Sequence, residues 1–571
     1  MGSRWVGFEA AQAEVEGGVK SRTAALESIQ DKIFDVCVVG AGATGAGSAL
    51  DSQLRGLKTV LLDGGDFASG ASTAATKIIH GGVRYLEEAV RHLDPAQYAV
   101  VNRALHERIH MLHNGPFLSR PLEFLIPCPN WFAVGYMGLG MKLYEWIAGK
   151  DGLFPSRFLS KAETLKRMPG LAANHLIGSI AYADGQFDDG RYDIGLINTF
   201  VEAGGEVLNY ARVVGFGKAD SGKLESAEVA DQLSALRFTV RASRFVNATG
   251  PHADTLRGLA TPGVVPRMRL SKGAHLVLPL DVFPTKDALL IPKTDDGRVL
   301  FAVPWFDRLL VGTTEEEVTA ADELYLSQKD VEYLLHHINR YFATAIRAEQ
   351  IVSGFAGARP LVSAGSGDTK KLARDHEVEV DQKSGLISIM GGKWTTHRAM
   401  AEDTINAVQN SLGRKVTPGV TLDHPLSGSD GYGDGYWASL MQGFNVTEQT
   451  AKHLSQKFGT NATEVLQLTR DDKALAAPIV PGFAPLRAEI VYCARNEMAV
   501  TIEDVLMRRT GLQFFSWRAA ARAAGPTAAI LAKELGWSAE YEKSRAAAYE
   551  MKINRWIQLA GLREMVEVTA G

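Results

Sequence analysis

Gly40, Gly42 and Gly45 form a GxGxxG pattern directly after an apolar, β-branched run over residues 34–39. In such a pattern the first glycine makes a tight turn, the second lets the backbone approach a pyrophosphate, and the third lets the next helix pack on the strand. The N-terminus of that helix then faces the phosphates. The spacing therefore predicts a dinucleotide site, the alternative being a glycine-rich turn that arises by chance.

Asp63 ends a second apolar run over residues 59–62, about 20 residues after the glycines, where its carboxylate can accept a hydrogen bond from a ribose hydroxyl. Strand, glycine turn, helix, second strand and terminal acid follow one another in the order of a βαβ unit. This order favours an adenine dinucleotide, but it does not choose between NAD and FAD.

Residues 64–76 are rich in glycine and serine, and the next segment, KIIHGGVRYL, interleaves polar and apolar side chains. Large side chains are rare in the first part, which suits a backbone that wraps a cofactor. A plain surface loop is the alternative. The cofactor interpretation is favoured by the interleaved polar residues Thr76, Lys77, His80, Arg84 and Tyr85.

His106, Glu107 and His110 form an HExxH motif within a pattern that predicts a helix over residues 93–113. The two histidines would share one helix face, as in zinc proteases. No residue downstream supplies an obvious third ligand, so a packed or solvated helix is the favoured interpretation. We therefore predict no metal site.

Composition restricts the remaining classes of protein. Lysine and arginine number 61 against 65 acidic residues, so the formal charge of −4 gives no general attraction to nucleic acid. The length of 571 residues predicts more than one domain. The three cysteines form no CxxC, which favours a reducing compartment. Residues 1–32 lack the pattern of a secretory signal or a transit peptide, so we expect a helical or disordered extension.

Residues 131–148 form the most apolar stretch, yet they include Lys142 and Glu145 and are not expected to span a membrane. Their aromatic residues suit a helix that lies in a membrane interface. A buried helix of a second domain is the alternative, and the residues alone do not choose between the two.

Two later strand patterns end at residues that could meet the same cofactor. A strand over residues 238–246 runs into Thr249 and Gly250. A strand over residues 386–390 runs into a glycine turn, Gly391 and Gly392, and then into a helix. In a doubly wound sheet both strand ends would lie at the edge that binds ligands.

The middle of the chain predicts a mixed or antiparallel sheet. Residues 271–279 alternate like a half-buried strand that carries His275, and further strands are expected over 298–305 and 309–313. Residues 353–361 are interpreted as turn-rich around Arg359. After about residue 411 the patterns are mainly helical.

With these elements the chain resembles the flavin-dependent glycerol-3-phosphate dehydrogenases, and it is more similar to the mitochondrial type than to the short bacterial one. The segments that carry the resemblance follow the family's order and extend from residue 34 to residue 512. They are GAGATGAGSALDSQLRGLKTVLLD, KIIHGGVRYLEEAV, LHERIHML, ADGQFDDGRYDIGL, VNATGP, GAHLVLP, VPWFDRLLVGTTE, ARPLV, ARDHEVEVD, GGKWTTHRAMAEDTINA and AVTIEDVLMRRTGL. The calcium-binding tail of animal relatives is not expected, because no DxDxDG loop follows Gly511.

The resemblance implies an α/β fold with a Rossmann-like FAD-binding domain over residues 33–410. A substrate domain with a mixed or antiparallel sheet would be interleaved in it, at about 111–184 and 266–349, and a helical C-terminal domain would follow over residues 411–571. It also implies oxidation of sn-glycerol 3-phosphate to dihydroxyacetone phosphate by hydride transfer to N5 of FAD, with the electrons passed to membrane quinone. Peripheral attachment is then expected, to the mitochondrial inner membrane in a eukaryote or to the cytoplasmic face of the inner membrane in a bacterium, and a homodimer is compatible with the family.

The resemblance assigns residues to the cofactor and to the substrate. The FAD-binding residues that it implies are Gly40, Gly42, Gly45, Asp63, Ser69, Gly70, Ser72, Thr76, Lys77, Thr249, Gly250, Gly392, Thr395 and Thr396. A phosphate with a charge of about −1.5 to −2 needs several cations. The residues implied for the substrate are Arg84, Tyr85, Arg359, Arg374 and Lys393.

His275 matches the family's active-site histidine and is the candidate base for the C2 hydroxyl, with Arg374 and Lys393 as further catalytic residues. Lys393 is a rival base, since a lysine among arginines can have a lowered pKa. Without the resemblance, a histidine whose hydrogen bonds are satisfied within its strand would be the simpler interpretation.

A few positions depart from the family's pattern, namely Ala71, Ala74 and Ala75 in place of polar residues, Ala358 in place of a bulkier one, His397 in place of tyrosine, and Asp63 in place of glutamate. None removes a charge assigned to the substrate. Three alternatives stay open: an oxidase that passes electrons to oxygen and releases peroxide, a flavoenzyme for another substrate such as an amino acid, and a catalytically silent FAD-binding partner protein.

Overall fold

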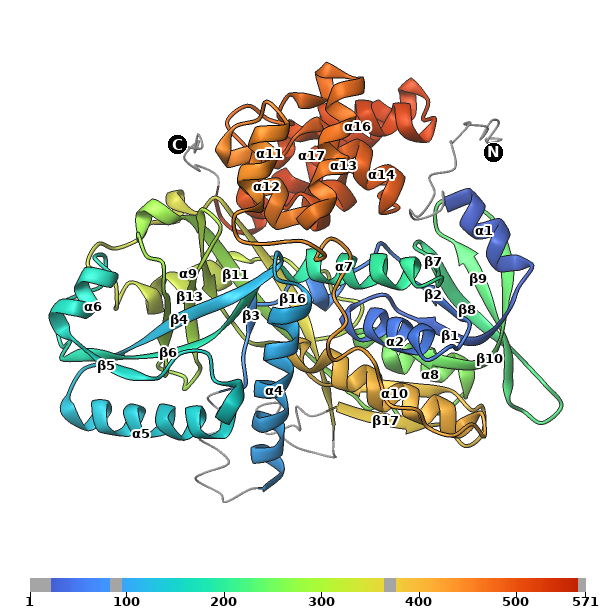
Figure 1. The fold of residues 1–571 in the computed structure, drawn as a ribbon, viewed down its shortest axis with the longest axis horizontal. Helices are drawn as coiled ribbons and strands as arrows, with labels where there is room; N and C mark the ends of the chain where they lie inside the picture. Colours follow the sequence, from blue (N-terminus) through green and yellow to red (C-terminus); the bar gives the residue numbers. More distant parts are fainter. Residues whose placement is uncertain (1–21, 83–94, 364–375, 563–571) are drawn as a thin grey trace.

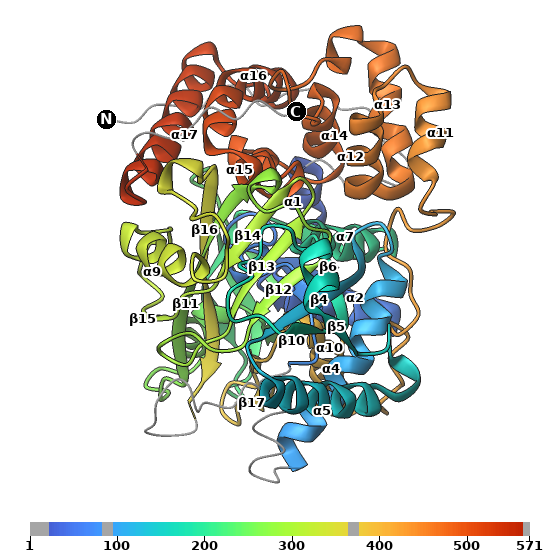
Figure 2. The ribbon, with the colours of Figure 1, turned by 90° about the vertical axis from the view of Figure 1, so that its left-hand side faces the viewer.

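The computed structural model describes residues 22–82, 95–363 and 376–562, and these form two β-sheets and a separate group of helices (Figure 1). Sheet A contains the N-terminal glycine-rich unit, and sheet B lies beside it. Helices from the last part of the chain cover one side of both sheets (Figures 1 and 2). The arrangement confirms the expected α/β fold with a helical C-terminal region.

Sheet A follows the strand order β17-β18-β10-β1-β2-β7, with β1 parallel to β2 on one side and to β10 on the other. The carboxyl end of β1 is therefore a topological switch point, where open α/β sheets bind ligands. Its strands are β1 (Ile33–Val39), β2 (Thr59–Leu62), β7 (Glu206–Leu208), β8 (Ala211–Lys218), β9 (Leu224–Asp231), β10 (Arg237–Asn247), β17 (His376–Val380) and β18 (Ile387–Gly391). The helices around it are α1 (Arg22–Gln30), α2 (Ala43–Leu54), α7 (Asp189–Glu202), α8 (Ala253–Ala260) and α10 (His397–Ser411).

Sheet B is mainly antiparallel, in the order β15-β11-β14-β13-β12-β4-β6-β3, with β16 added to β11 and β5 to β6. Its strands are β3 (Ile78–Ile79), β4 (Ser119–Cys128), β5 (Arg157–Ser160), β6 (Gly178–Phe187), β11 (Met268–Pro279), β12 (Ala288–Ile291), β13 (Leu300–Trp305), β14 (Arg308–Gly312), β15 (Glu316–Val318) and β16 (Ser353–Val362). Helices α4 (Pro95–Asn114), α5 (Trp131–Ala148), α6 (Lys161–Arg167) and α9 (Gln328–Ile338) pack around it. Strands β3 and β16 lie outside the two ranges expected for the substrate domain.

Two expectations about β11 and β16 are wrong. Residues 353–361 form a strand and not a turn-rich segment, because β16 pairs with β11 through ten residues. Gly354 allows a close approach to the His275 carbonyl of β11, and Gly357 allows one to Ala74. A Cβ on Gly357 would lie 2.6 Å from Ala74 Cβ. Residues 271–279 are buried on both faces and not on one. Ala274 and Leu276 join the hydrophobic core, while on the other face Gly273 is covered by Arg359 and Thr313, and His275 by Thr76.

The C-terminal region is helical, as expected. Its helices are α11 (Tyr436–Gly443), α12 (Glu448–Phe458), α13 (Ala462–Asp471), α14 (Arg487–Asn496), a π-helical segment (Asp504–Arg509), α15 (Leu512–Phe515), α16 (Trp517–Leu535) and α17 (Ala539–Leu559). Side chains of α12, α14, α15 and α16 belong to the same hydrophobic core as sheet B. The region is thus packed continuously onto the sheet.

Helix α5 lies along β4 and β6 at one end of the molecule (Figure 1). Its inner side chains, including Met141 and Tyr144, are buried, so the alternative of a buried helix holds for that face alone. Its outer face is apolar and exposed: Trp131, Phe132, Leu139 and Trp146 are 66–82% exposed. No helix among the described residues is both long and apolar enough to cross a bilayer.

The HExxH segment lies on α4, and its residues have other partners. His106 Nδ1 is 2.9 Å from Asp151 Oδ2, and His110 Nδ1 is 3.3 Å from Asp423 Oδ1. Glu107 is buried and accepts two hydrogen bonds from the Arg398 guanidinium. The acid between the histidines thus forms an ion pair, as the preferred interpretation of a packed helix implies.

Candidate functional site

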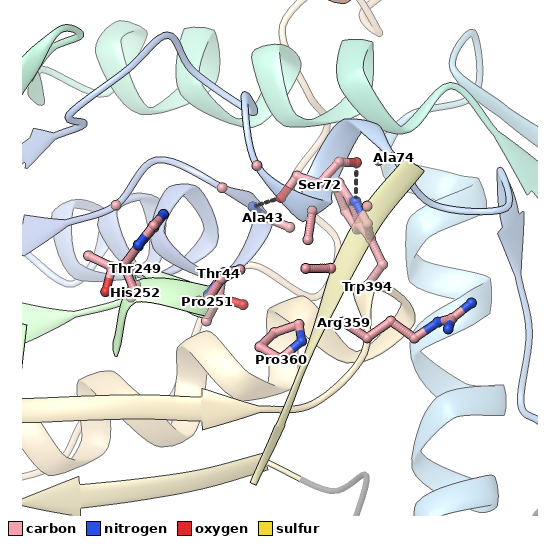
Figure 3. Close-up of a pocket in the computed structure, with 18 of the residues that line it drawn as sticks. Ala43, Thr44, Ser72, Ala74, Thr249, Pro251, His252, Arg359, Pro360 and Trp394 are labelled. Carbon is pink, nitrogen blue, oxygen red and sulfur yellow. Dashed lines mark hydrogen bonds between the residues drawn. The ribbon is translucent and has the colours of Figure 1, made fainter. Parts of the chain in front are cut away.

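A cavity of about 650 Å³ lies where the carboxyl edge of sheet A meets strands β11 and β16 of sheet B. The turn between β1 and α2, residues 69–76, the end of β10 and the turn at residues 391–395 complete its walls (Figure 3). The predicted site residues that line it are Gly40, Gly42, Asp63, Ser69, Gly70, Ser72, Thr76, Thr249, Gly250, His275, Arg359, Gly392, Lys393 and Thr395. Segments far apart in the chain therefore meet in one cavity.

One end of the cavity is formed by the glycine turn. Gly40 has a φ of +103°, and a Cβ there would lie 2.6 Å from the carbonyl oxygen of Ala248. A Cβ on Gly42 would lie 2.8 Å from Ser72 Oγ, and Gly42 caps α2 without a side-chain hydrogen bond. Gly45 lies behind the turn, where a Cβ would lie 1.7 Å from the carbonyl oxygen of Gly40. The first turn of α2 thus meets the cavity as a pyrophosphate site requires.

Asp63 lies at the end of β2, beside this turn. Its carboxylate accepts hydrogen bonds from the backbone N–H groups of Ala41, at 2.6 Å, and Gly65, at 2.8 Å. Burial raises the pKa of Asp63 to about 6, against the effect of these two hydrogen bonds, which lower it. The carboxylate therefore fixes the glycine turn while it lines the cavity.

The turn that follows β18 connects the two ends of the site. The indole Nε1 of Trp394 donates a hydrogen bond of 2.9 Å to the backbone carbonyl of Ser72, and Ser72 Oγ accepts one of 2.9 Å from the Ala43 N–H (Figure 3). The His80 N–H donates to Thr395 Oγ1 at 3.3 Å. These bonds hold the 391–396 turn against the start of α2.

His275 projects from β11 into the other end of the cavity. Its Nε2 lies 3.0 Å from Thr76 Oγ1, and its ring stacks on Phe355 with centroids 4.7 Å apart. Nδ1 is buried and has no hydrogen-bond partner among the described residues. Burial, together with the positive charges of Arg359 and Lys77, lowers the pKa of His275 to about 3. The imidazole is therefore neutral near pH 7.

Arg359 projects from β16 into the same end, away from Thr249 and His252 (Figure 3). Its Nη2 donates a hydrogen bond of 2.8 Å to Thr313 Oγ1. Lys393 lines the cavity from the turn after β18. A neutral imidazole and two cations thus share one end of the cavity, which suits an anionic substrate with a hydroxyl to deprotonate.

Besides Gly45, two residues expected at the cofactor, Lys77 and Thr396, do not line the cavity. Lys77 is fully buried, with a φ of +64°, and its ammonium is hydrogen-bonded to Asp189 and lies 4.4 Å from the centroid of Phe514. This buried ion pair directs the Lys77 side chain away from the cofactor site. Thr396 donates a hydrogen bond of 3.2 Å to the carbonyl of Lys393 and so supports the turn from behind.

Arg84, Tyr85 and Arg374 lie outside the described residues, so their expected roles stay predictions. The structure adds cavity residues that the sequence did not single out, among them Arg212, His252 and Thr44. Thr313, the partner of Arg359, was also not singled out. Its only signal was its place directly after an apolar strand, where a sheet edge exposes polar side chains.

One cluster of potential metal ligands occurs among the described residues, formed by Asp295, His336 and His337 on the surface around α9. The guanidinium of Arg340 is hydrogen-bonded to Asp295 in the same cluster. A cation already neutralises this carboxylate, and the cluster is not part of the cavity.

The donor groups of the cavity fit FAD. Backbone at the start of α2 and the bare glycines 40 and 42 suit a pyrophosphate, and Asp63 stands at the strand end where a ribose hydroxyl is expected. The cavity continues from there to Lys393 and His275, where a flavin ring would meet a substrate.

Comparisons with known proteins agree with this fit. Residues 35–404 match the family model described as FAD dependent oxidoreductase, and residues 419–542 match the model described as C-terminal domain of alpha-glycerophosphate oxidase. The chain is 37% identical to the mitochondrial glycerol-3-phosphate dehydrogenase of Rattus norvegicus over 531 residues, which covers 91% of this chain and 73% of that protein. It is also 37% identical to the corresponding protein of Homo sapiens, over 92% of this chain and 73% of that protein.

Two solved structures with bound FAD share the fold of this chain. The glycerol-3-phosphate dehydrogenase from Bacillus halodurans complexed with FAD matches with a TM-score of 0.76 and 27% identity, over 96% of this chain and 99% of that chain. The L-alpha-glycerophosphate oxidase from Mycoplasma pneumoniae with FAD bound shares the fold, with a TM-score of 0.53 and 18% identity over 69% of this chain and 99% of that one.

Proposed function

Because the chain belongs to the FAD-dependent glycerol-3-phosphate dehydrogenases, we propose that it oxidises sn-glycerol 3-phosphate to dihydroxyacetone phosphate and passes the electrons to a membrane quinone. The observation that carries the proposal is the meeting of His275, Arg359 and Lys393 in one cavity with the glycine turn. The cations supply charge for a phosphate, and the histidine supplies a base for a neighbouring hydroxyl.

Arg359 and Lys393 bind the phosphate, Arg359 through directed hydrogen bonds and Lys393 as a point charge. Arg84, Tyr85 and Arg374 complete this set by the family resemblance. When bound, FAD accepts the hydride that leaves C2. The side chains of the protein hold the substrate and move the proton.

His275 accepts the proton of the C2 hydroxyl through Nδ1. For Nδ1 to carry a lone pair, Nε2 must carry the ring hydrogen and donate it to Thr76 Oγ1, which lies 3.0 Å away. The Thr76 hydroxyl can accept this hydrogen, so its place is compatible with the tautomer that acts as a base. Lys393 is the rival base, and a His275→Asn variant distinguishes the two, since it removes the basic ring nitrogen and leaves the lysine in place.

The test is anaerobic reduction of the purified holoenzyme. Addition of glycerol 3-phosphate should bleach the flavin absorbance, while glycerol, which lacks the phosphate, and amino acids at the same concentration should not. A yellow protein whose flavin stays oxidised with glycerol 3-phosphate would instead be the silent FAD-binding partner. If an amino acid bleached the flavin and glycerol 3-phosphate did not, the substrate would be an amino acid.

Oxygen is the alternative electron acceptor. It is a second candidate because residues 419–542 match a domain described from an alpha-glycerophosphate oxidase. The two acceptors are distinguished by turnover of glycerol 3-phosphate in air with a soluble quinone analogue. A dehydrogenase reduces the analogue and yields little peroxide, whereas an oxidase yields one peroxide for each substrate and is little affected by the analogue.

Helix α5 supports attachment to a bilayer, which is where a quinone is reached. Its exposed residues Trp131, Phe132, Leu139 and Trp146 form an apolar face, and Lys142 and Lys150 are exposed beside it. Aromatic and aliphatic side chains on one face with cations at its margin are typical of a helix that lies in the membrane interface. We propose that this face of α5 binds a phospholipid surface.

A further inference from the structure

The Arg359 side chain passes over the neighbouring strand at a glycine. In the register of β16 on β11, Arg359 lies opposite Ser271 and Gly357 lies opposite Gly273. A Cβ on Gly273 would lie 2.4 Å from Arg359 Nη2 and 2.8 Å from its Cζ. Real Cβ atoms are never found so close to another group, so the guanidinium occupies the space that any other residue at position 273 would fill.

Beyond Gly273 the guanidinium meets the residue that follows β14. Thr313 Oγ1 accepts the hydrogen bond of 2.8 Å from Arg359 Nη2, and the same hydroxyl donates one of 3.1 Å to the carbonyl of Thr314. A hydroxyl has one hydrogen and two lone pairs. Since the hydrogen is directed to Thr314, the hydroxyl presents a lone pair to the guanidinium.

The same strand end also determines the space for His275. In the register of β11 on β14, His275 lies opposite Gly312, and a Cβ on Gly312 would lie 2.1 Å from His275 Cδ2. Gly312 and Thr313 are adjacent in the chain. One dipeptide therefore borders both the imidazole and the guanidinium.

We infer that Gly273 and Thr313 are positioning residues that form a slot for Arg359, and that this slot sets where the substrate phosphate binds relative to His275. Gly273 is the floor of the slot and the Thr313 hydroxyl is its end. Neither residue need touch the substrate, because each acts through the guanidinium. The inference rests on the proposed function in one respect, that Arg359 binds the phosphate.

The inference is tested on the FAD-loaded enzyme with Thr313→Val, Thr313→Ser and Gly273→Ala, each alone and in an Arg359→Ala background. Two quantities are measured: KM and kcat for glycerol 3-phosphate, and the Kd of inorganic phosphate from the change that it causes in flavin absorbance. Thr313→Val and Gly273→Ala should each raise KM and the phosphate Kd about tenfold or more, the usual size of a lost hydrogen bond to a charged group. The value of kcat should change little, since the lost interaction is made with bound substrate and transition state alike.

Two further results distinguish a slot for Arg359 from a general structural role. Thr313→Ser keeps the hydroxyl and should restore KM and the phosphate Kd to near the original values. In the Arg359→Ala background, Thr313→Val should cause no further loss, because the group on which it acts is gone.

The failures of the two proposals are separable. If glycerol 3-phosphate does not reduce the flavin of the unaltered enzyme, the proposed function fails. If that flavin is reduced, three results would each overturn the slot. Thr313→Val could leave KM unchanged, or it could give the same KM and phosphate Kd as Thr313→Ser. It could also still weaken phosphate binding in the Arg359→Ala background. Where Gly273→Ala yields no folded protein, the comparison of the two Thr313 variants decides.

Discussion

The ammonium of Lys457, on α12, donates a hydrogen bond of 2.5 Å to the carboxylate of Asp188 at the start of α7, and both side chains are buried. Although burial raises the pKa of Asp188, the charges of Lys457 and Lys77 hold it below its ordinary value. Arg191 of α7 is likewise paired with Glu497, and Arg509 with Asp66. Buried ion pairs thus join the C-terminal helices to the cofactor-binding part, with the cation on the C-terminal side in two of these pairs and the carboxylate on that side in the third.

Substitution Lys457→Met should destabilise the protein strongly, because it removes one partner and leaves the other buried without it. The free energy of unfolding is expected to fall by about 3 kcal/mol or more, measured by chemical denaturation of the holoenzyme. The matched control is Lys452→Met on the same helix, whose exposed pair with Glu448 is worth about 0.5 kcal/mol or less. Equal losses in the two variants would show that the pair with Asp188 contributes no more than a surface one.

Substitution Gly312→Ala should impair catalysis without loss of FAD. The new Cβ would fall 2.1 Å from His275 Cδ2, so the imidazole must leave the position in which Nε2 lies 3.0 Å from Thr76 Oγ1. We expect kcat to drop by about 100-fold, the scale of a displaced general base, while bound flavin per protein stays unchanged. Gly258→Ala is the control, because a Cβ there meets nothing within 4 Å. An unchanged kcat in Gly312→Ala would argue against His275 as the base.

Arg359→Ala should raise KM for glycerol 3-phosphate strongly, by about 100-fold for the loss of charge-assisted hydrogen bonds. The FAD content should stay the same, since Arg359 lies at the opposite end of the cavity from the glycine turn. Steady-state kinetics with flavin quantification checks both statements. A normal KM would remove Arg359 from the phosphate site.

Buried histidines should make stability fall as pH is lowered. Burial lowers the pKa of His397 to about 3, although its hydrogen bond with the Trp394 carbonyl opposes this effect. The unfolded chain binds a proton near pH 6.5 while the folded one does not, so stability is lost below about pH 6.5 and is not lost above it. Between pH 7.5 and pH 5 this histidine costs about 2 kcal/mol.

The variant His397→Asn tests this dependence, because it keeps an N–H for the Trp394 carbonyl and cannot titrate. Its unfolding free energy should fall about 2 kcal/mol less than that of the unaltered protein between pH 7.5 and pH 5. Parallel pH dependence in the two proteins would mean that His397 is protonated in the folded state.

The nucleotide-binding unit could be predicted because all of its determinants are local. Strand β1, the glycine turn, α2 and β2 follow one another, and each glycine has a steric task that the contiguous chain defines. Strand β16 could not be predicted in this way. Glycine and alanine provide no side-chain pattern, and the strand forms because β11, far away in the chain, pairs with it through ten residues.

Lys77 and Thr313 show the same limit for the site. Lys77 adjoins the segment expected to wrap the cofactor. Only the tertiary structure shows that its ammonium forms a hydrogen-bonded ion pair with Asp189. Thr313 carries no motif of its own, and its role depends on β14, β11 and β16 lying side by side. Pairings between distant strands decide such roles, and local residue patterns do not contain them.

The apolar face of α5 should bind phospholipid. A double substitution, Phe132→Ser with Leu139→Ser, removes two side chains that are 82% and 75% exposed, so the fold should be unaffected. Each such side chain contributes about 1.5–3 kcal/mol when it leaves water, and even partial insertion predicts a loss of vesicle affinity of tenfold or more. Binding is measured by co-sedimentation with vesicles of phosphatidylcholine and phosphatidylglycerol, beside flavin reduction in solution as a check of the intact site.

The matched control is Met551→Ser, whose side chain is 66% exposed. Met551 belongs to α17, and this helix lies at the opposite side of the molecule from α5 (Figure 1). It should leave vesicle binding unchanged, since its side chain is apolar and exposed but is not part of the α5 face. Equal binding by the control and the double variant would place the membrane-binding surface elsewhere. Loss of binding in the double variant alone, with flavin reduction retained, would separate attachment to the bilayer from chemistry at the cavity.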